Sequence, residues 1–300
     1  MRRVKRVLAT SAGTLALLAS GAPADAADQA LTHDPTASNV STHSGQPVWS
    51  RIARDGRARL VQRVRGRNRD LPVRPKDGPF DPDVGTTLRG NFTVVYTRCA
   101  GLSGQACDIW QYDGFDFKER KVPGASSGRC SEYAPSVWLG SVAFARTGPG
   151  GCNGLYVVRR GKIRKLDTRV PAETDLRGKY VAYLFIPPGD HTRTYIRIRN
   201  KRNKRSRILV TGFASEGESY RVTSPVMTSR FTYWLQEDRV RNQFFAGRGL
   251  FARRSPLEFL NRTLPPRVDS IAITRERLYY ANGKGVFLAT DPLPVFAPRG

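Results

Sequence analysis

The amino-acid sequence predicts an all-β protein made of repeated short strands. An apolar, strand-like run recurs six times, and each copy carries one marker aromatic: Trp49, Tyr96, Phe144, Tyr183, Tyr233 and Tyr280. The intervals between these markers are 47, 48, 39, 50 and 47 residues. A period of about 40–50 residues with alternating apolar and polar positions is typical of a propeller. We therefore predict a six-bladed β-propeller of four-stranded antiparallel blades in residues 37–300.

Each repeat supplies four strand-like segments, which the third copy illustrates. The first strand is predicted at 134–139, the marker strand follows the Leu139-Gly140 turn, and the later strands lie at 155–158 and 163–166. One such meander cannot bury both of its faces, but a radial array buries each blade against two neighbours. The marker aromatics are therefore expected between blades. The predicted blades are approximately 37–73, 83–123, 131–166, 173–211, 221–260 and 268–296.

The N-terminus has the pattern of a secretory signal peptide in residues 1–26. Basic residues in 1–6 precede a small, apolar run at 7–22, and Ala24-Asp25-Ala26 fits a cleavage site. An uncleaved membrane anchor is the alternative. Residues 27–36 form an N-terminal segment. The last repeat has no clear fourth strand beyond 294–296, and the segment 30–40 is predicted to supply one, closing the ring and covering a sheet edge.

Four cysteines are present, namely Cys99, Cys107, Cys130 and Cys152. An even number in an exported chain indicates two disulfides, and spacing alone leaves all three pairings open. In a propeller, the turns between second and third strands and the connections between blades share one face, which we call the top face. All four cysteines are placed there, two in each of two blades. This placement favours Cys99–Cys107 and Cys130–Cys152, with a structural role.

The third repeat resembles the blades of TolB-like and related WD-like propellers. Pro135, Trp138, Gly140, the Val142-Ala143-Phe144 segment and the Leu155-Tyr156-Val157 strand follow the order of that repeat. The usual Ser-Pro-Asp-Gly turn is replaced by Leu139-Gly140, and the Leu-Thr ending is missing. Residues 37–296 are similar to uncharacterised secreted TolB-like proteins of actinobacteria. The resemblance implies the propeller fold and leaves the activity open.

The chain is strongly basic, with a formal net charge of +25. Residues 1–26 carry four Lys/Arg and one Asp, a net of +3, so the mature chain keeps +25 − 3 = +22. Turns between first and second and between third and fourth strands share the opposite face, which we call the bottom face. A basic patch is predicted there from Arg159, Arg160, Lys162, Arg164, Lys165, Arg199, Lys201, Arg202, Lys204, Arg205 and Arg207. This patch predicts binding to anionic envelope material; a merely solvated set of turn tips is the alternative.

Acidic residues are concentrated at the predicted start of inner strands. Glu132, Glu173, Asp175 and Asp269 are candidate residues of the channel mouth, where hard oxygen ligands could hold Ca²⁺ for a lactonase-like hydrolase. Acids that only solvate the mouth are the simpler interpretation, and no cofactor is predicted. The chain has three histidines, and His191 has no partners in sequence that indicate a catalytic triad.

The sequence therefore predicts a binding or scaffolding module at the cell envelope, secreted or extracytoplasmic, and no catalytic residue is assigned. Its expected partner is an envelope protein or an anionic envelope polymer, with peripheral membrane contact as a further option. Nucleic acid is not an expected partner, because the basic turns lack interleaved aromatics. A metal-dependent hydrolase and a carbohydrate-binding lectin, with Tyr133 or Phe80 as stacking residues, are the alternatives.

Overall fold

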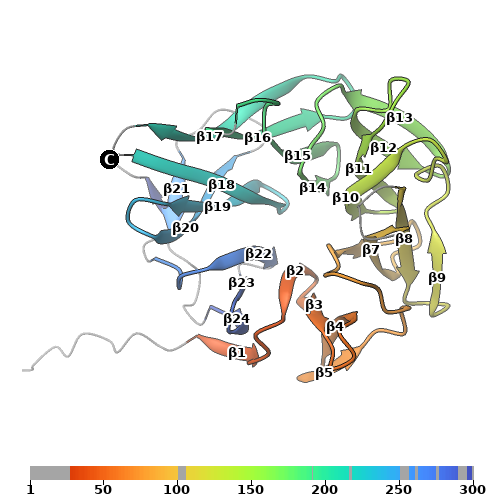
Figure 1. Cartoon of the computed structure of the whole chain (residues 1–300), viewed down its shortest axis with the longest axis horizontal. Helices are drawn as coiled ribbons and strands as arrows, with labels where there is room; N and C mark the ends of the chain where they lie inside the picture. Colours follow the sequence, from red (N-terminus) through yellow and green to blue (C-terminus); the bar gives the residue numbers. More distant parts are fainter. Residues whose placement is uncertain are drawn as a thin grey trace, which may run out of the picture.

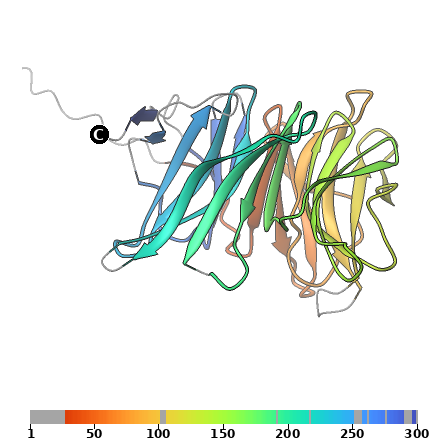
Figure 2. The same ribbon diagram turned by 90° about the horizontal axis from the view of Figure 1, so that it is seen from above.

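The structure is a computed structural model that describes residues 28–100, 106–190, 192–215, 218–250, 257–260, 263–274, 277–289 and 296–298. The predicted signal peptide and His191 lie outside these residues. Figure 1 shows the strands arranged radially around a centre, and Figure 2 shows them running across the thickness of the disc. The turns therefore lie on its two faces. No helix in the described part has the length and apolar character needed to span a bilayer.

Three consecutive meanders each form a separate four-stranded antiparallel sheet. The first contains β2 (Ser38–His43), β3 (Gln46–Ile52), β4 (Ala58–Val64) and β5 (Arg67–Asp70). The second contains β6 (Asp83–Thr86), β7 (Phe92–Cys99), β8 (Cys107–Asp113) and β9 (Lys118–Lys121). The third contains β10 (Ser131–Trp138), β11 (Ser141–Thr147), β12 (Gly154–Arg159) and β13 (Lys162–Asp167). These sheets confirm the predicted four-stranded antiparallel blade.

The next two meanders are joined in one nine-stranded sheet. Its first half is β14 (Glu173–Arg177), β15 (Tyr180–Phe185), β16 (Arg193–Asn200) and β17 (Ser206–Ser215). Its second half is β18 (Glu218–Met227), β19 (Phe231–Asp238), β20 (Gln243–Leu250), β21 (Glu258–Leu260) and β25 (Phe296–Pro298). Because β17 and β18 each extend to ten residues, their adjoining ends pair. The sequence predicts six separate sheets. The structure instead joins the fourth and fifth meanders in one sheet, which corrects this prediction.

The last sheet combines the N-terminal strand with the final meander of the chain. It contains β22 (Val268–Thr274), β23 (Arg277–Asn282) and β24 (Gly285–Leu288), and its fourth strand is β1 (Gln29–Thr32), which pairs antiparallel with β24. The segment 294–296 was the expected remnant of a fourth strand here. Instead β25, which includes residue 296, pairs with β21 in the nine-stranded sheet. The N-terminal strand thus joins the last sheet to the first, as predicted.

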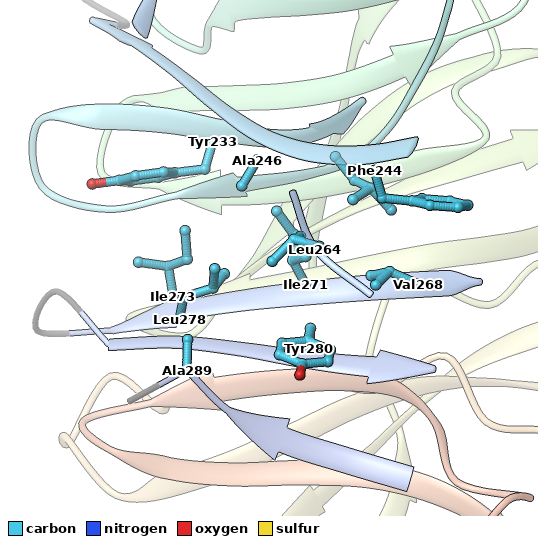
Figure 3. Packing of buried hydrophobic residues seen from close by; sticks show 11 residues of the cluster. Tyr233, Phe244, Ala246, Leu264, Val268, Ile271, Ile273, Leu278, Tyr280 and Ala289 are labelled. Carbon is cyan, nitrogen blue, oxygen red and sulfur yellow. The ribbon is translucent and has the colours of Figure 1, made fainter. Parts of the chain in front are cut away.

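The core lies between neighbouring sheets, and the marker aromatics are part of it. All six are buried, and each lies on the second strand of its meander. Figure 3 shows one interface, where Ile271, Ile273 and Leu264 lie between Tyr233 of β19 and Tyr280 of β23. Burial of each large side chain contributes about 1.5–3 kcal/mol to the free energy of unfolding. The prediction that these aromatics pack in the core is confirmed.

Three of the innermost strands contain a β-bulge at a non-glycine residue of positive φ. The residues are Asn39 of β2, Ala134 of β10 and Ser224 of β18, with φ of 53°, 49° and 51°. A bulge interrupts the ladder and turns backbone groups away from the neighbouring strand of the same sheet. In this protein such groups bond to the adjacent meander: the Ser224 N–H donates to Glu173, and the Ala134 carbonyl accepts from Thr174.

Candidate functional site

A cavity of about 600 Å³ lies at the centre of the ring. It is lined by the innermost strand of every meander, namely β2, β6, β10, β14, β18 and β22. Five carboxylates reach it: Asp81, Asp83, Glu173, Asp175 and Asp269. Glu173, Asp175 and Asp269 are the acids that the sequence predicts at this mouth. Asp81 and Asp83 join them because β6 begins beside the same opening.

Asp83 links three inner strands. Its Oδ2 accepts a hydrogen bond of 2.6 Å from the backbone N–H of Val137 on β10. Its Oδ1 accepts one of 3.0 Å from the Ser41 hydroxyl on β2. The Ser41 oxygen in turn accepts from the N–H of Val84 at 3.1 Å. Asp83 therefore holds the edges of three sheets together.

Side chains of β14 form hydrogen bonds with the backbone of the inner strands on both sides, β18 and β10. Glu173 Oε2 accepts a hydrogen bond of 2.7 Å from the N–H of Ser224 on β18, and Asp175 Oδ2 accepts one from the N–H of Met227. On the other side, the Thr174 hydroxyl donates to the carbonyl of Ala134 at 2.7 Å. The carboxylates thus satisfy backbone N–H donors on the open edge of β18, one of them at the bulge.

The remaining two channel acids, Asp81 and Asp269, accept hydrogen bonds from residues of their own meander. The backbone N–H and hydroxyl of Thr97 donate to Asp81 at 2.8 and 2.5 Å. The Ser270 hydroxyl donates to Asp269 Oδ1 at 2.9 Å, and the Ser270 oxygen accepts from the N–H of Val40 at 3.0 Å. The last bond joins β22 to β2 across the ring closure.

Burial in the channel favours the protonated form of several of these acids. Desolvation raises the pKa of Glu173 to about 7, although the hydrogen bond from Ser224 opposes it. Desolvation also raises the pKa of Asp175 to about 6. The pKa of Asp83 lies well above its ordinary value because of burial and, second, the negative charge of Asp175. At neutral pH the channel is therefore less anionic than its five carboxyl groups would suggest.

Glu132 does not belong to the channel group, which corrects the sequence prediction. Its side chain is fully buried, and Oε1 lies 2.8 Å from Arg146 Nε on the adjacent strand β11. Desolvation raises its pKa to about 7, and Arg146 opposes that shift. Side chains alternate between the two faces of a strand. On β10, Glu132 therefore points away from the channel, which Tyr133 lines.

The end of the channel nearer the bottom face has a different chemistry. The Arg177 guanidinium carbon lies 3.6 Å from the centre of the Trp138 ring, and His43 lies 5.6 Å from the same ring. Burial and the positive charge of Arg177 lower the pKa of His43, so the imidazole is neutral at pH 7. This end combines a cation, an indole and a neutral imidazole.

The channel acids do not assemble into a metal centre. Across the residues that the structure describes, no group of three or more His, Cys, Asp or Glu side chains has an arrangement that could hold a metal ion. The oxygens of Asp83, Glu173 and Asp175 instead accept hydrogen bonds from backbone N–H groups. A calcium-dependent activity stays a prediction. The described residues provide no set of side-chain ligands for the ion.

Three residues of the predicted basic patch, Lys165, Arg199 and Arg207, do not belong to it in the structure. Lys165 Nζ donates to the carbonyl of Gly151 at 3.0 Å, so it points toward the top face. Arg199 forms an ion pair of 3.1 Å with the buried carboxylate of Asp167, and Arg207 donates to the carbonyl of Leu250. In each case the side chain bonds within the fold rather than at a turn tip.

The other eight cations lie in or beside the β12–β13 and β16–β17 turns, and we call them the cationic cluster: Arg159, Arg160, Lys162, Arg164, Lys201, Arg202, Lys204 and Arg205. In the described residues none of the eight forms an ion pair with a carboxylate. Arg164 of β13 donates to the carbonyl of Lys201 in the β16–β17 turn, which joins the two contributing sheets. Burial, and then the charges of Arg159, Arg164 and Arg202, lower the pKa of Lys201 to about 8. The cluster is therefore a concentrated positive charge without an internal counter-charge.

The two disulfides are Cys99–Cys107 and Cys130–Cys152, the pairings that the sequence analysis favoured. Both cysteines of the first pair also line the central cavity. Each disulfide closes a short loop within or beside one sheet, and such bonds stabilise by about 2–4 kcal/mol.

Phe80 and Tyr133, the residues predicted to stack on a sugar in a lectin, lie in different environments. Phe80 is completely buried and packs edge-on against Tyr96, with the ring centres 5.1 Å apart. It therefore belongs to the core. Tyr133 is partly exposed and lines the central cavity.

No family model matches the sequence, and no curated protein matches it. The fold is similar to solved propellers at low sequence identity. SapL1 lectin, solved with alpha methyl fucoside, has 12% identity and a TM-score of 0.53, over 89% of this chain and 97% of the lectin. A chain of a nidogen/laminin complex has 11% identity and a TM-score of 0.52, over 76% of this chain and 82% of that chain.

TolB from Acinetobacter baumannii is also similar, with 14% identity and a TM-score of 0.48. The match covers 69% of this chain and 49% of TolB, so it spans about half of the length of TolB. Identities at this level show the fold alone. The β-propeller fold is therefore shared with proteins of different functions, and the function has to be argued from the side chains.

Proposed function

We propose that this protein is an exported, six-bladed propeller that binds anionic cell-envelope material through its bottom face. The nine-stranded sheet acts as two blades in this proposal, because it contains two consecutive four-stranded meanders, β14–β17 and β18–β21, with β25 added at its edge. Two disulfides are consistent with an extracytoplasmic location. A nidogen/laminin complex contains a similar propeller, which agrees with a role in binding.

The cationic cluster is the observation that carries the proposal. Arg159, Arg164, Lys201 and Arg202 come from two sheets and are close enough to depress the pKa of Lys201. A protein surface that only needs solubility has no reason to concentrate like charges in this way, because their mutual repulsion opposes folding. A phosphate or carboxylate polymer supplies the counter-charge that the described residues do not.

The test is binding of the mature chain to fluorescently labelled long-chain polyphosphate, measured by anisotropy at low and high salt. The variant Arg202→Gln/Lys204→Gln/Arg205→Gln removes three charges from the β16–β17 turn. Each cation near an anionic surface contributes about 1 kcal/mol, so affinity should fall by about tenfold or more in dilute salt. The difference should shrink at about 1 M salt, where the Debye length is about 3 Å.

A matched control removes three cations from the top face, with Arg54→Gln/Arg129→Gln/Arg193→Gln. Net charge changes equally, so general attraction to a basic protein predicts equal losses for both variants. The proposal predicts a clearly smaller loss for the control. Wild-type affinity in the β16–β17 variant would refute the proposal.

A further inference from the structure

Four large apolar side chains lie exposed at the turns of two neighbouring sheets on the bottom face. Leu88 is in the β6–β7 turn, Phe115 and Phe117 are in the β8–β9 turn, and Leu139 is in the β10–β11 turn. Their exposed fractions are 42%, 70%, 68% and 45%. We call these residues the apolar tips. Large apolar residues gathered at one surface indicate an interaction site.

Two of the apolar tips occupy backbone conformations that disfavour them. Phe117 has a φ of 56° and Leu139 a φ of 45°, in the left-handed region where Gly and Asn are preferred. An exposed side chain at such a position adds no core packing and leaves the backbone strained. The folding of the turn therefore gives no reason for Phe or Leu there, and strain of this kind is found at functional positions.

The apolar tips and cationic side chains share one surface. A cavity of about 620 Å³ between the two sheets is lined by Leu88, Phe115, Arg89, Arg159 and Arg160. The β10–β11 turn is fixed beside the β6–β7 turn, because the N–H of Gly140 donates to the carbonyl of Thr86 at 2.9 Å. Arg159 and Arg160 also belong to the cationic cluster, so the two features are continuous.

Few carboxylates lie on this surface. In the bottom turns at 44–45, 65–66, 87–91, 114–117, 139–140, 160–161, 178–179 and 201–205, all of which the structure describes, the only acid is Asp116. Asp113, at the end of β8, also lines the cavity, and both acids pair with Arg120, at 2.8 and 2.9 Å. The surface is therefore both apolar and cationic over the β6–β9 and β10–β13 sheets. It is cationic over the adjoining part of the nine-stranded sheet.

We propose that the bottom face docks onto an anionic lipid bilayer, with the apolar tips inserted among the headgroups and the cationic cluster paired with lipid phosphates. This inference rests on the proposed function and names its partner. A phosphate polymer would engage the cations but would gain nothing from Phe115, Phe117 or Leu139. A bilayer interface offers apolar depth directly below a layer of negative charge, and this matches the arrangement of both groups.

The test compares binding of the mature chain to vesicles of phosphatidylglycerol and phosphatidylcholine with its binding to soluble polyphosphate. The variant Phe117→Asn/Leu139→Asn removes two apolar tips while keeping residues that accept a positive φ and all charges. Its affinity for the vesicles should fall by tenfold or more, and its affinity for polyphosphate should equal that of wild type. Its melting temperature should not decrease, because Asn relieves strain at both positions.

The matched control is Phe213→Ser/Val240→Ser, which removes two exposed apolar side chains away from the bottom turns, at the β18-facing end of β17 and in the β19–β20 turn. It should bind vesicles as wild type does. Equal vesicle binding by wild type and the Phe117/Leu139 variant would overturn the bilayer proposal and leave polyphosphate binding intact. Equal losses in the variant and the control would also overturn it. If wild type binds neither the vesicles nor polyphosphate, both this inference and the proposed function are overturned.

Discussion

Single residues of the channel show how a carboxylate can be both accessible and structural. Glu173 and Asp175 line the cavity, yet each also accepts a hydrogen bond from the backbone of β18. These acceptors are needed because the Ser224 N–H, at the bulge, and the Met227 N–H, on the open edge of β18, both point out of the sheet. Their presence at strand starts is therefore explained by inter-blade bonding before any ligand is considered.

Replacement of Glu173 by Gln tests the protonation of this group. The folded-state pKa of about 7 exceeds the ordinary 4.5, so wild-type stability falls as pH rises between these values. Gln keeps an acceptor for the Ser224 N–H and has no charge to desolvate. Glu173→Gln should be more stable than wild type at pH 8, and this difference should diminish toward pH 5. Urea unfolding across this pH range measures it.

The control for this experiment is Glu237→Gln, which removes a carboxylate on β19 outside the channel. It should keep the wild-type slope of stability against pH. A slope for Glu173→Gln identical to that of wild type would show that Glu173 is ionised in the folded protein at pH 7.

Glu132 shows why a residue's face cannot be assigned from its position in the sequence alone. It begins an inner strand, as Glu173 does, but its side chain lies on the opposite face of its strand and meets Arg146. A shift of one residue in the strand start reverses the face of every side chain. The strand predicted at 134–139 overlaps β10 (Ser131–Trp138), but the sequence left its start and its register open.

At the scale of elements, the turns of the bottom face decide which cations are available. Long side chains on strands, such as Lys165 and Arg199, reach partners inside the fold. Cations in the β12–β13 and β16–β17 turns have no such partner within reach in the described residues. The patch is therefore smaller than the run of basic residues in the sequence.

Lys201 makes the cationic cluster sensitive to mild alkali. Its pKa of about 8 means that it is largely charged at pH 7 and largely neutral at pH 9. Affinity of wild type for polyphosphate should therefore fall over this range. Lys201→Arg should retain its affinity, because the guanidinium stays protonated. Fluorescence anisotropy at pH 7 and pH 9 provides the comparison.

Lys162→Arg is the matched control, since it makes the same replacement at an exposed site in the same cluster. It should show the wild-type loss of affinity at pH 9. If Lys201→Arg loses affinity as wild type does, the titration of Lys201 does not contribute to binding.

At the scale of the whole molecule, β1 holds the ring closed. Leu31 is buried in a cluster with Trp49 of β3 and Val286 of β24, so it contacts both the first and last sheets. Arg63 and Asn68 donate to the Leu31 carbonyl at 3.1 and 2.9 Å. The strand therefore ties the first sheet to the last, alongside the direct contact between β2 and β22.

Removal of residues 27–33 should open the ring. The loss includes the burial of Leu31, about 1.5–3 kcal/mol, and it exposes the edge of β24. We expect a lower urea midpoint and increased light scattering from edge-to-edge association. Leu31→Ala is the milder variant and should cost about 2 kcal/mol without aggregation. An unchanged midpoint after truncation would contradict the closing role of β1.

The sequence by itself determined the repeat, the four-stranded meanders of the first three sheets and the buried markers. These depend on alternation, turn residues and spacing, all of which are local properties of the chain. The disulfide pairing followed only when the cysteines were placed on a propeller. The tertiary structure decided which side of a strand Glu132 faces, which cations bond internally, and how β17 and β18 merge two meanders. It also brought Leu88, Phe115 and Leu139 together with the basic turns. Such arrangements join residues from different sheets, and distance in space between sheets is not encoded in any local pattern.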